Sequence, residues 1–592
     1  MIPNNTVSPK PRSKKHVILR LARYIFAHKW MVLGAVSLTI ASNLLALLGP
    51  ALSGYAIDAI GTEAGMAKFN QVYFYCFLML VFYVVSSALT YVLSILMTKL
   101  SQRISYQMRK DLVDKLLELP VRFFDGHQTG DIISRLSYDI DTITASLSND
   151  LLQIAASAIT VFGSFFMMLA ISPVLILVFA FTIPASVLFI IYRTKKVRPL
   201  FRKRSAKLGE LNGFVEEIIS GQKTTKAYHQ EETMVGRFDV KNNEAVDAYY
   251  MADYYGSTVG PSVNFINNIS LTLISIFGSL LYLVGSVSLG NLSSFVLYSR
   301  RFSGPINEMA NIISELQSAA SAAERVFRLI DEQPESADLP QATALADVKG
   351  DVQMQDIQFG YDPEKIIIHD LNLHARPGSL VAIVGPTGAG KTTMVKLLMR
   401  FYDVSSGAIL LNGYDVKQFT RKDLRDSFGM VLQDTWLYND TIRENIRFGR
   451  LDATDEEVLA AAKAAQVDHF VRTLPHGYDT VLNEEGTNVS QGQKQLLTIA
   501  RTIISNPKIM ILDEATSSVD TRTEILIQKA MNKLTEGRTS FIIAHRLSTI
   551  RDADIILVMR DGDIVETGNH QELLARGGFY AELYNSQFAG AE

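Results

Sequence analysis

Four long stretches without a charged residue dominate the first half of this 592-residue chain. They cover residues 31–57, 71–98, 151–192 and 254–299. A helix needs roughly 20 apolar residues to cross the hydrocarbon core of a bilayer, so the two longest stretches must each hold two crossings. Turn-forming residues stand where those two would reverse, at Ser172-Pro173 and within residues 285–291. The pattern predicts six membrane-spanning helices, because a soluble core does not supply this many uncharged runs of this length.

Composition agrees with a membrane protein and argues against a nucleic-acid partner. Mean hydropathy is +0.14, charged residues make up 20 % of the chain, and the net charge is −3. The first thirty residues carry seven Lys or Arg and no acidic residue, which predicts a cytoplasmic N-terminus rather than a cleaved signal peptide. The single cysteine, Cys76, excludes a disulfide within the chain.

Two highly charged segments separate the crossings, at residues 99–150 and 193–253. They lack the Gly- and Pro-rich composition of disorder, so we expect helices that continue from the bilayer into the cytoplasm. A polar, proline-containing linker follows at residues 331–350, and then short β-branched runs alternate with amphipathic segments. We therefore expect a transmembrane domain over 1–330, a linker over 331–350 and an α/β domain over 351–592.

The α/β half contains a complete phosphate-binding loop after the apolar run at residues 380–384. This G-x-x-x-x-G-K-[ST] motif lets backbone N–H groups and a helix N-terminus converge on a polyphosphate. The lysine would reach the β- and γ-phosphates, and the threonine hydroxyl would bind Mg²⁺. The loop predicts ATP or GTP binding through Gly385, Pro386, Thr387, Gly388, Ala389, Gly390, Lys391 and Thr392, with Thr393 beside them.

A second buried-strand pattern, residues 509–512, ends in two carboxylates. An apolar strand that delivers an aspartate to a phosphate-binding loop is a Walker B element, in which Asp513 would hold Mg²⁺. Glu514 follows directly and is placed to polarise the attacking water as a general base.

Between these motifs stands Val489-Ser490-Gln491-Gly492-Gln493, followed by a helix-forming segment. The set resembles the ATP-binding-cassette family, whose signature Leu-Ser-Gly-Gly-Gln precedes such a helix. Six spans followed by one cassette resemble the half-transporter layout of the type IV exporters over the whole chain.

That resemblance implies further roles. Tyr361 looks like the aromatic that stacks on adenine, and Gln433 resembles the Q-loop residue that senses Mg²⁺ and the attacking water. Asp520 resembles the D-loop residue, and His545 the switch histidine on the γ-phosphate. In this family the signature faces the ATP held by the other subunit, which implies that Ser490, Gly492 and Gln493 contact a second subunit's nucleotide.

One position departs from the family pattern, because Gln491 replaces the first glycine of the signature. A side chain would then project where the backbone should approach the γ-phosphate, although Lys391, Asp513, Glu514 and His545 are all present. This combination resembles the catalytically intact subunit of heterodimeric bacterial multidrug exporters. We therefore expect a heterodimer, with a homodimer that tolerates Gln491 as the alternative.

Two cytoplasmic segments resemble the coupling helices of these exporters. They are residues 123–131, Phe-Phe-Asp-Gly-His-Gln-Thr-Gly-Asp, and residues 209–213, Gly-Glu-Leu-Asn-Gly.

The fold class expected from all this is membrane α-helical, with six transmembrane helices extended into the cytoplasm, plus an α/β P-loop nucleotide-binding domain. The resemblance implies an ATPase using ATP and Mg²⁺ that exports amphipathic or hydrophobic compounds across a bacterial cell membrane by alternating access. The resemblance also implies that the protein contacts membrane lipid and that its nucleotide-binding domain lies in the cytoplasm. The charge-free runs offer no counter-ion for a polar substrate. A lipid flippase or a peptide exporter is the nearest alternative, and an ATP-gated channel or regulatory subunit a more distant one.

Overall fold

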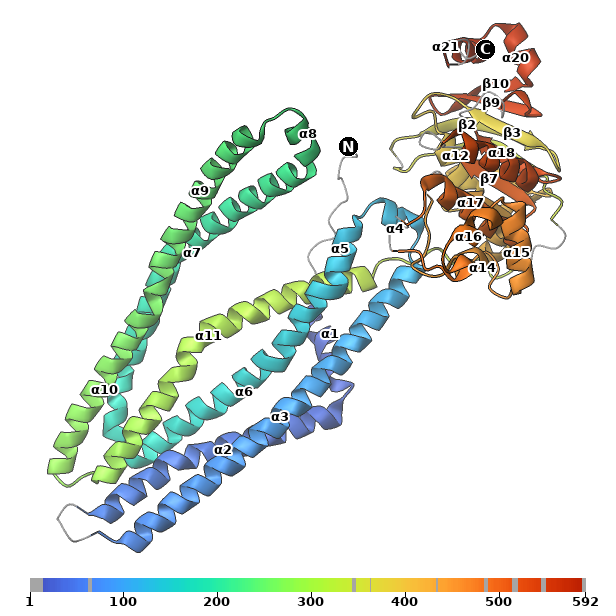
Figure 1. Cartoon of the computed structure of the whole chain (residues 1–592). Coiled ribbons are helices and arrows are strands. Elements are labelled where there is room, and N and C mark those ends of the chain that lie inside the picture. Colours follow the sequence, from blue (N-terminus) through green and yellow to red (C-terminus); the bar gives the residue numbers. More distant parts are fainter. Residues whose placement is uncertain are drawn as a thin grey trace. The chain divides into compact units, whose positions relative to one another are not determined.

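The computed structural model describes residues 14–61, 67–342, 348–362, 364–432, 435–483, 488–513, 520–544 and 550–587. The chain forms two compact units, coloured along the sequence in Figure 1. The first holds residues 1–117 and 129–332, and the second holds residues 118–128 and 333–592. The short segment 118–128 therefore belongs to the C-terminal unit, although helices of the first unit flank it in sequence.

The first unit is helical, and three of its helices, of 50, 48 and 42 residues, are far longer than a bilayer is thick. Its helices are α1 (Lys14–Phe26), α2 (Lys29–Ile60), α3 (Phe69–Glu118), α5 (Thr129–Ser134), the π-helical turn η1 (Arg135–Asp139), α6 (Ile140–Ile171), α7 (Pro173–Ser220), α8 (Gln222–Ala227), α9 (Glu231–Ser257), α10 (Val259–Leu283) and α11 (Leu289–Ile330). The reversal predicted at Ser172-Pro173 is confirmed, because α6 ends at Ile171 and α7 begins at Pro173. The charged segments do continue the apolar helices, as α3 and α7 show.

Five helical stretches in the described part of the chain are long and apolar enough to cross a membrane. They are Lys29–Ile60, Phe69–Glu118, Thr129–Ile171, Pro173–Ser220 and Glu231–Leu283. The sixth expected crossing falls on α11, which is not among the five. Arg300 and Arg301 interrupt its apolar stretch, and Arg301 Nη1 donates a hydrogen bond to the Ala46 carbonyl of α2.

Helix α11 packs along α6 and α2, and α7 runs beside α9, as Figure 1 also shows. The core between them gathers Leu47, Met168, Phe179, Phe295, Tyr298 and Phe302, among others. The buried Tyr298 hydroxyl donates to the Leu47 carbonyl at 2.6 Å, so the one polar atom of that ring is satisfied. Glycines let α2 and α11 approach closely, since a Cβ on Gly54 would lie 2.6 Å from the Gly290 carbonyl oxygen.

The second unit is an α/β fold built on two sheets. A four-stranded antiparallel sheet has the order β2-β1-β4-β5, and a six-stranded sheet has the order β10-β9-β3-β8-β7-β6. Strands β9, β3, β8, β7 and β6 run parallel, while β10 pairs antiparallel with β9. The strands are β1 (Val352–Phe359), β2 (Ile368–Ala375), β3 (Leu380–Val384), β4 (Ser406–Leu411), β5 (Tyr414–Asp415), β6 (Phe428–Val431), β7 (Ile509–Asp513), β8 (Thr539–Ile543), β9 (Ile555–Arg560) and β10 (Asp563–Gly568).

Helices flank these sheets, and the buried apolar side chains of the described residues gather in separate clusters rather than in one. The helices are α4 (Val121–Asp125), α12 (Lys391–Leu398), α13 (Arg421–Asp426), α14 (Ile442–Arg447), α15 (Asp455–Ala464), α16 (Asp468–Thr473), α17 (Gln491–Ser505), α18 (Thr521–Thr535), α20 (His570–Arg576) and α21 (Phe579–Gln587), with 3₁₀ turns η2 (Val416–Gln418) and η3 (Gly477–Asp479). The central strands are buried on both faces, which is why they read in sequence as continuous apolar runs.

Of the two predicted coupling segments, only the first stands apart as a short helix. Residues 123–131 cover the end of α4 and the start of α5. Residues 209–213 instead lie inside the continuous helix α7, so that prediction is wrong. The short helix between α7 and α9 is α8, at Gln222–Ala227. The two glycines at 209 and 213 did not break the helix, because glycine lowers helix propensity by only about 1 kcal/mol and neighbouring residues can outweigh it.

Candidate nucleotide site

The predicted phosphate-binding loop lies at the carboxyl end of the buried strand β3 and leads into helix α12. Strand β3 is held between β8 and β9 by parallel pairing, which fixes where the loop starts. Gly390 is the N-cap of α12, with φ 101°, a conformation that glycine adopts without strain. Residues 385–392 therefore have the strand–loop–helix context in which the helix N-terminus can face phosphate.

Close approach of the backbone explains the first glycine of the loop. A Cβ on Gly385 would lie 2.3 Å from the carbonyl oxygen of Met559 in β9. Any side chain there would push the loop off the neighbouring strand, so the glycine keeps the loop seated on the sheet.

The Lys391 ammonium is held above the loop by the loop's own carbonyls. Its Nζ donates to the Gly385 oxygen at 2.6 Å and to the Pro386 oxygen at 3.1 Å. Burial lowers the pKa of Lys391, and the negative charge of Asp513 acts in the opposite direction. A partly desolvated cation so close to the loop is suited to pair with an anionic phosphate.

Asp513 lies at the carboxyl end of β7, as the Walker B pattern predicts. Strand β8 separates β7 from β3, and Asp513 pairs in register with Ile543 of β8. Parallel strands bring their carboxyl ends to one edge of the sheet, which is why Asp513 acts on the charge of Lys391. A threonine hydroxyl at the start of α12 and a carboxylate at the end of β7 are oxygen ligands of the kind that Mg²⁺ prefers.

Tyr361 follows β1 and packs edge-on against two other rings. Its ring centroid lies 5.1 Å from Phe359 and 5.0 Å from Tyr402. Its hydroxyl lies 3.2 Å from the Thr393 hydroxyl of α12. The structure therefore links the aromatic residue implied for adenine to the helix that follows the phosphate loop.

The signature segment caps helix α17 through two reciprocal hydrogen bonds. Ser490 Oγ accepts from the Gln493 amide at 3.3 Å, and Gln493 Oε1 accepts from the Ser490 amide at 2.9 Å. This is a capping box, and the Ser-x-x-Gln spacing alone could have predicted it. Ser490 and Gln493 thus have a local structural role in addition to the one implied by resemblance.

The side chain of Gln491 is engaged within its own unit. Its Nε2 donates to Thr435 Oγ1 at 3.2 Å, and Thr435 lies just beyond β6. The glutamine therefore bridges the start of the signature helix and the segment after β6. Sequence reasoning expected a side chain projecting toward the nucleotide and missed this contact, which joins residues far apart in the chain.

Asp520 is the N-cap of α18, where its carboxylate accepts from the Thr523 amide at 3.0 Å. That hydrogen bond is the main reason that the pKa of Asp520 is lowered. Three predicted residues, Gln433, Glu514 and His545, lie outside the described residues. The strands that precede the latter two, β7 and β8, are neighbours in the sheet.

Helix α4 is docked on the same unit, close to Tyr361 and the end of α12. Asp125 Oδ2 accepts from Lys396 Nζ at 2.7 Å and from the Tyr402 hydroxyl at 2.6 Å. Arg122 Nη2 donates to the Tyr361 carbonyl at 3.1 Å. No local pattern identifies Lys396, Tyr402 or Arg122, because their partners are hundreds of residues away in the sequence.

Comparison with known proteins places these features in a family. Residues 32–306 match the ABC transporter transmembrane region, and residues 368–517 match the ABC transporter family. A fatty acid ABC transporter ATP-binding/permease protein of Mycobacterium bovis is 46 % identical over 81 % of this chain and 76 % of its own length. A Staphylococcus aureus protein named for multidrug export is 34 % identical over 96 % of this chain and all of its own length.

A solved structure agrees over nearly the whole chain. The structure of a bacterial Atm1-family ABC exporter with ATP bound has a TM-score of 0.78 and is 31 % identical, covering 95 % of this chain and 99 % of that one. This chain belongs to the ABC transporter family. It is a half-transporter of the exporter type, with one transmembrane and one nucleotide-binding domain, whose ATPase activity is coupled to transport. As a half-transporter it works with a second half.

Proposed function

We propose that this half-transporter uses ATP hydrolysis to export amphipathic or hydrophobic compounds out of the cell. The observation that carries the proposal is the joining of long uncharged helices to a complete phosphate-binding loop in one chain. The uncharged runs favour an apolar cargo, since a polar one needs compensating groups within the bilayer. Aromatic rings that stay exposed in the first unit, such as Tyr73, Phe74 and Phe77, could contact lipid or cargo.

At the nucleotide site we assign roles residue by residue. Residues 385–393 cradle the phosphates, Lys391 pairs with the β- and γ-phosphates, and Tyr361 stacks on adenine. Thr392 and Asp513 would hold Mg²⁺, joined by Gln433, and the ion would neutralise charge that develops on the transferred phosphoryl group. Glu514 acts as general base toward water and His545 contacts the γ-phosphate; both assignments rest on sequence.

The second half is proposed to be a different chain. Gln491 stands where the family has glycine, while this chain's own Lys391, Asp513 and Glu514 are intact. In a heterodimer the altered signature would serve only one nucleotide site, and the partner's signature would meet Glu514. The residues of this chain that act at the partner's nucleotide are then Ser490, Gly492, Gln493 and Asp520.

We place the protein in a bacterial cell membrane with its N-terminus and nucleotide-binding domain in the cytoplasm. The support is the excess of Lys and Arg in the first thirty residues and in the charged extensions of α3 and α7.

Transport by the purified full-length complex in proteoliposomes tests the proposal. Wild-type complex should move a hydrophobic fluorescent dye when ATP is present, and Glu514→Gln should bind ATP yet lose most hydrolysis and transport. The cause is the loss of the base while the phosphate cradle survives. Near-wild-type ATPase turnover in Glu514→Gln would refute the assignment of the base, and dye movement independent of ATP would refute the exporter.

A lipid-like cargo is the second candidate, favoured by the 46 % identity to a relative named for fatty acids. The same vesicles can carry a fluorescent fatty acid in place of the dye. ATP-dependent movement of the fatty acid but not of the dye would select this candidate.

A further inference from the structure

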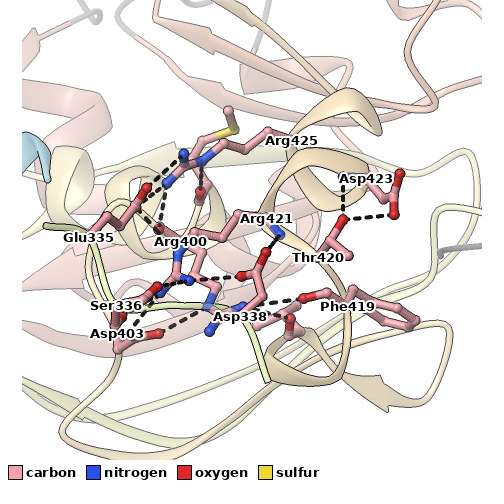
Figure 2. Close-up of polar contacts among 12 residues, drawn as sticks. Glu335, Ser336, Asp338, Arg400, Asp403, Phe419, Thr420, Arg421, Asp423 and Arg425 are labelled. Carbon is pink, nitrogen blue, oxygen red and sulfur yellow. Dashed lines mark hydrogen bonds and ion pairs between the residues drawn. The ribbon is translucent and has the colours of Figure 1, made fainter. Parts of the chain in front are cut away.

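Two arginines of helix α13 bind the start of the linker through hydrogen bonds and ion pairs, as Figure 2 shows. Arg421 donates to Asp338 Oδ1 at 2.8 Å and to Ser336 Oγ at 2.7 Å, and its backbone N–H donates to Asp338 Oδ2 at 3.1 Å. Arg425 forks onto both carboxylate oxygens of Glu335, at 2.5 and 3.3 Å. We call this group the linker clasp: Glu335, Ser336, Asp338, Arg421 and Arg425.

Burial makes the clasp more than a set of surface ion pairs. Arg421 is only 7 % exposed, and Asp338, Glu335 and Asp403 surround its guanidinium. A desolvated guanidinium is strongly unfavourable when its carboxylate partners are removed, whereas exposed pairs contribute little. Breaking these contacts while Arg421 stays buried would leave its charge uncompensated, so the contacts hold the linker to this unit.

The clasp also reaches the end of helix α12. Arg425 Nη2 donates to the Arg400 carbonyl at 3.2 Å, and Arg400 Nε pairs with Asp403 at 3.0 Å. Residues 400–403 directly follow α12, which begins at Lys391 in the phosphate-binding loop. Hydrogen bonds through Arg425 thus connect the linker to the residues that follow the phosphate-binding helix.

The segment that follows α3 rests on the same place. Asp125 of α4 binds Lys396 of α12 and Tyr402, both described above. The two segments also meet directly, because the Glu335 amide donates to the Glu118 carbonyl at 2.8 Å. The chain leaving α3 and the chain leaving α11 therefore share one anchor on the nucleotide-binding unit.

We propose that the linker clasp is a second coupling element, which transmits nucleotide-dependent movement of α12 to α11, beside the connection that α4 provides to α3. The proposal rests on the transport function proposed above. Without the clasp contacts, the start of the linker can move independently of the nucleotide-binding unit, so movement of α12 no longer reaches α11. ATP is then hydrolysed with less cargo transported per ATP. Arg421, Arg425, Glu335 and Asp338 are positioning residues in this scheme.

The test compares Arg421→Gln with Lys422→Gln in the full-length complex. Lys422 is the next residue of α13, is exposed, and makes no polar side-chain contact in the part of the chain that the structure describes, so it is the matched control. The first readout needs no cargo: hydrogen exchange of residues 312–330 of α11, with and without a non-hydrolysable ATP analogue. Wild type and Lys422→Gln should show nucleotide-dependent protection there, and Arg421→Gln should lose it while α4 keeps its own response.

The second readout is dye transported per ATP hydrolysed in proteoliposomes. We expect Arg421→Gln to keep ATPase activity within about twofold and to lose about tenfold in this ratio, using the tenfold scale of a single lost charged contact. Arg421→Lys, which keeps a cation beside Glu335 and Asp338, should recover part of the ratio that Arg421→Gln loses, which a change in packing alone would not predict.

Equal α11 responses in Arg421→Gln and Lys422→Gln would overturn the proposal. If Arg421→Gln does not fold, the milder Glu335→Gln and Asp338→Asn decide by the same comparison. The α11 readout stands even if no cargo moves, so a wrong transport assignment leaves wild-type vesicles inactive while the exchange experiment still judges the clasp.

Discussion

Replacing Asp125 with alanine should make helix α4 detach from the rest of the nucleotide-binding unit much more often than it does in the wild type. Asp125 accepts from the hydroxyl of Tyr402, which is 9 % exposed, and from the ammonium of Lys396. The alanine variant would leave the Tyr402 hydroxyl buried without this acceptor and Lys396 without its ion pair.

The magnitude follows from how exposed each group is. A hydrogen bond to a charged acceptor contributes roughly 1.5–3 kcal/mol, and we take about 1.5 because the Asp125 side chain is 41 % exposed. The ion pair with Lys396 adds roughly 0.5 kcal/mol at this exposure. A loss of about 2 kcal/mol corresponds to an about thirtyfold more favourable opening of α4. Asp125→Asn keeps an acceptor for the Tyr402 hydroxyl, so we expect the opening of α4 to become only about fivefold more favourable than in the wild type.

Hydrogen exchange of the full-length complex measures this opening directly. The amides of Phe123, Gly126 and His127 donate within α4 and its flanking turns, so their protection reports local opening. Asp131→Asn, at an exposed carboxylate on α5, is the matched control and should leave their protection unchanged. A double-mutant cycle with Tyr402→Phe isolates the hydroxyl–carboxylate contact.

The pH dependence has a definite sign. Burial alone raises the pKa of Asp125, but hydrogen bonds from Lys396 and Tyr402 outweigh burial and hold the pKa below its usual range. A depressed pKa in the folded state means full stabilisation above the unfolded-state value of about 4, lost as pH falls through the folded value. Protection of α4, corrected for intrinsic exchange, should therefore be constant from about pH 8 to 5.5.

Protection of the α4 amides in Asp125→Ala within twofold of wild type would refute the reasoning.

Two further substitutions test the nucleotide site. Lys391→Ala removes a charge-assisted contact of roughly 1.5–3 kcal/mol, so the Kd for a fluorescent ATP analogue should rise at least tenfold; an unchanged Kd at this site would contradict the role of the loop. Gln491→Gly should change ATPase turnover only modestly in a heterodimer, because the altered signature serves the site that lacks this chain's Glu514. A stable, transporting homodimer purified from this chain alone would refute the heterodimer and leave the exporter intact.

The amino-acid sequence by itself determines the membrane helices and the local motifs of the nucleotide site. Uncharged runs longer than a bilayer crossing have no stable place in a soluble core, so they predict membrane helices, and the turn at Ser172-Pro173 follows from proline at a helix start. The phosphate-binding loop and Asp513 are likewise local patterns, because strand, loop and helix are contiguous around residues 385–392. The capping box at Ser490 and Gln493 was readable at the same level.

Other features depend on contacts between distant segments, which only the folded chain decides. Residues 209–213 continue a helix despite two glycines, since propensity is weak against the surrounding helix. Gln491 meets Thr435 only because β6 and α17 pack together. Residues 118–128 belong to the nucleotide-binding unit through such contacts. The hydrogen bonds of Asp125 and of the linker clasp join residues from about 80 to nearly 280 positions apart in the sequence. A buried charged side chain pairs with whichever opposite charges the fold brings close to it. Because those partners are distant in the sequence, no local sequence pattern predicts them.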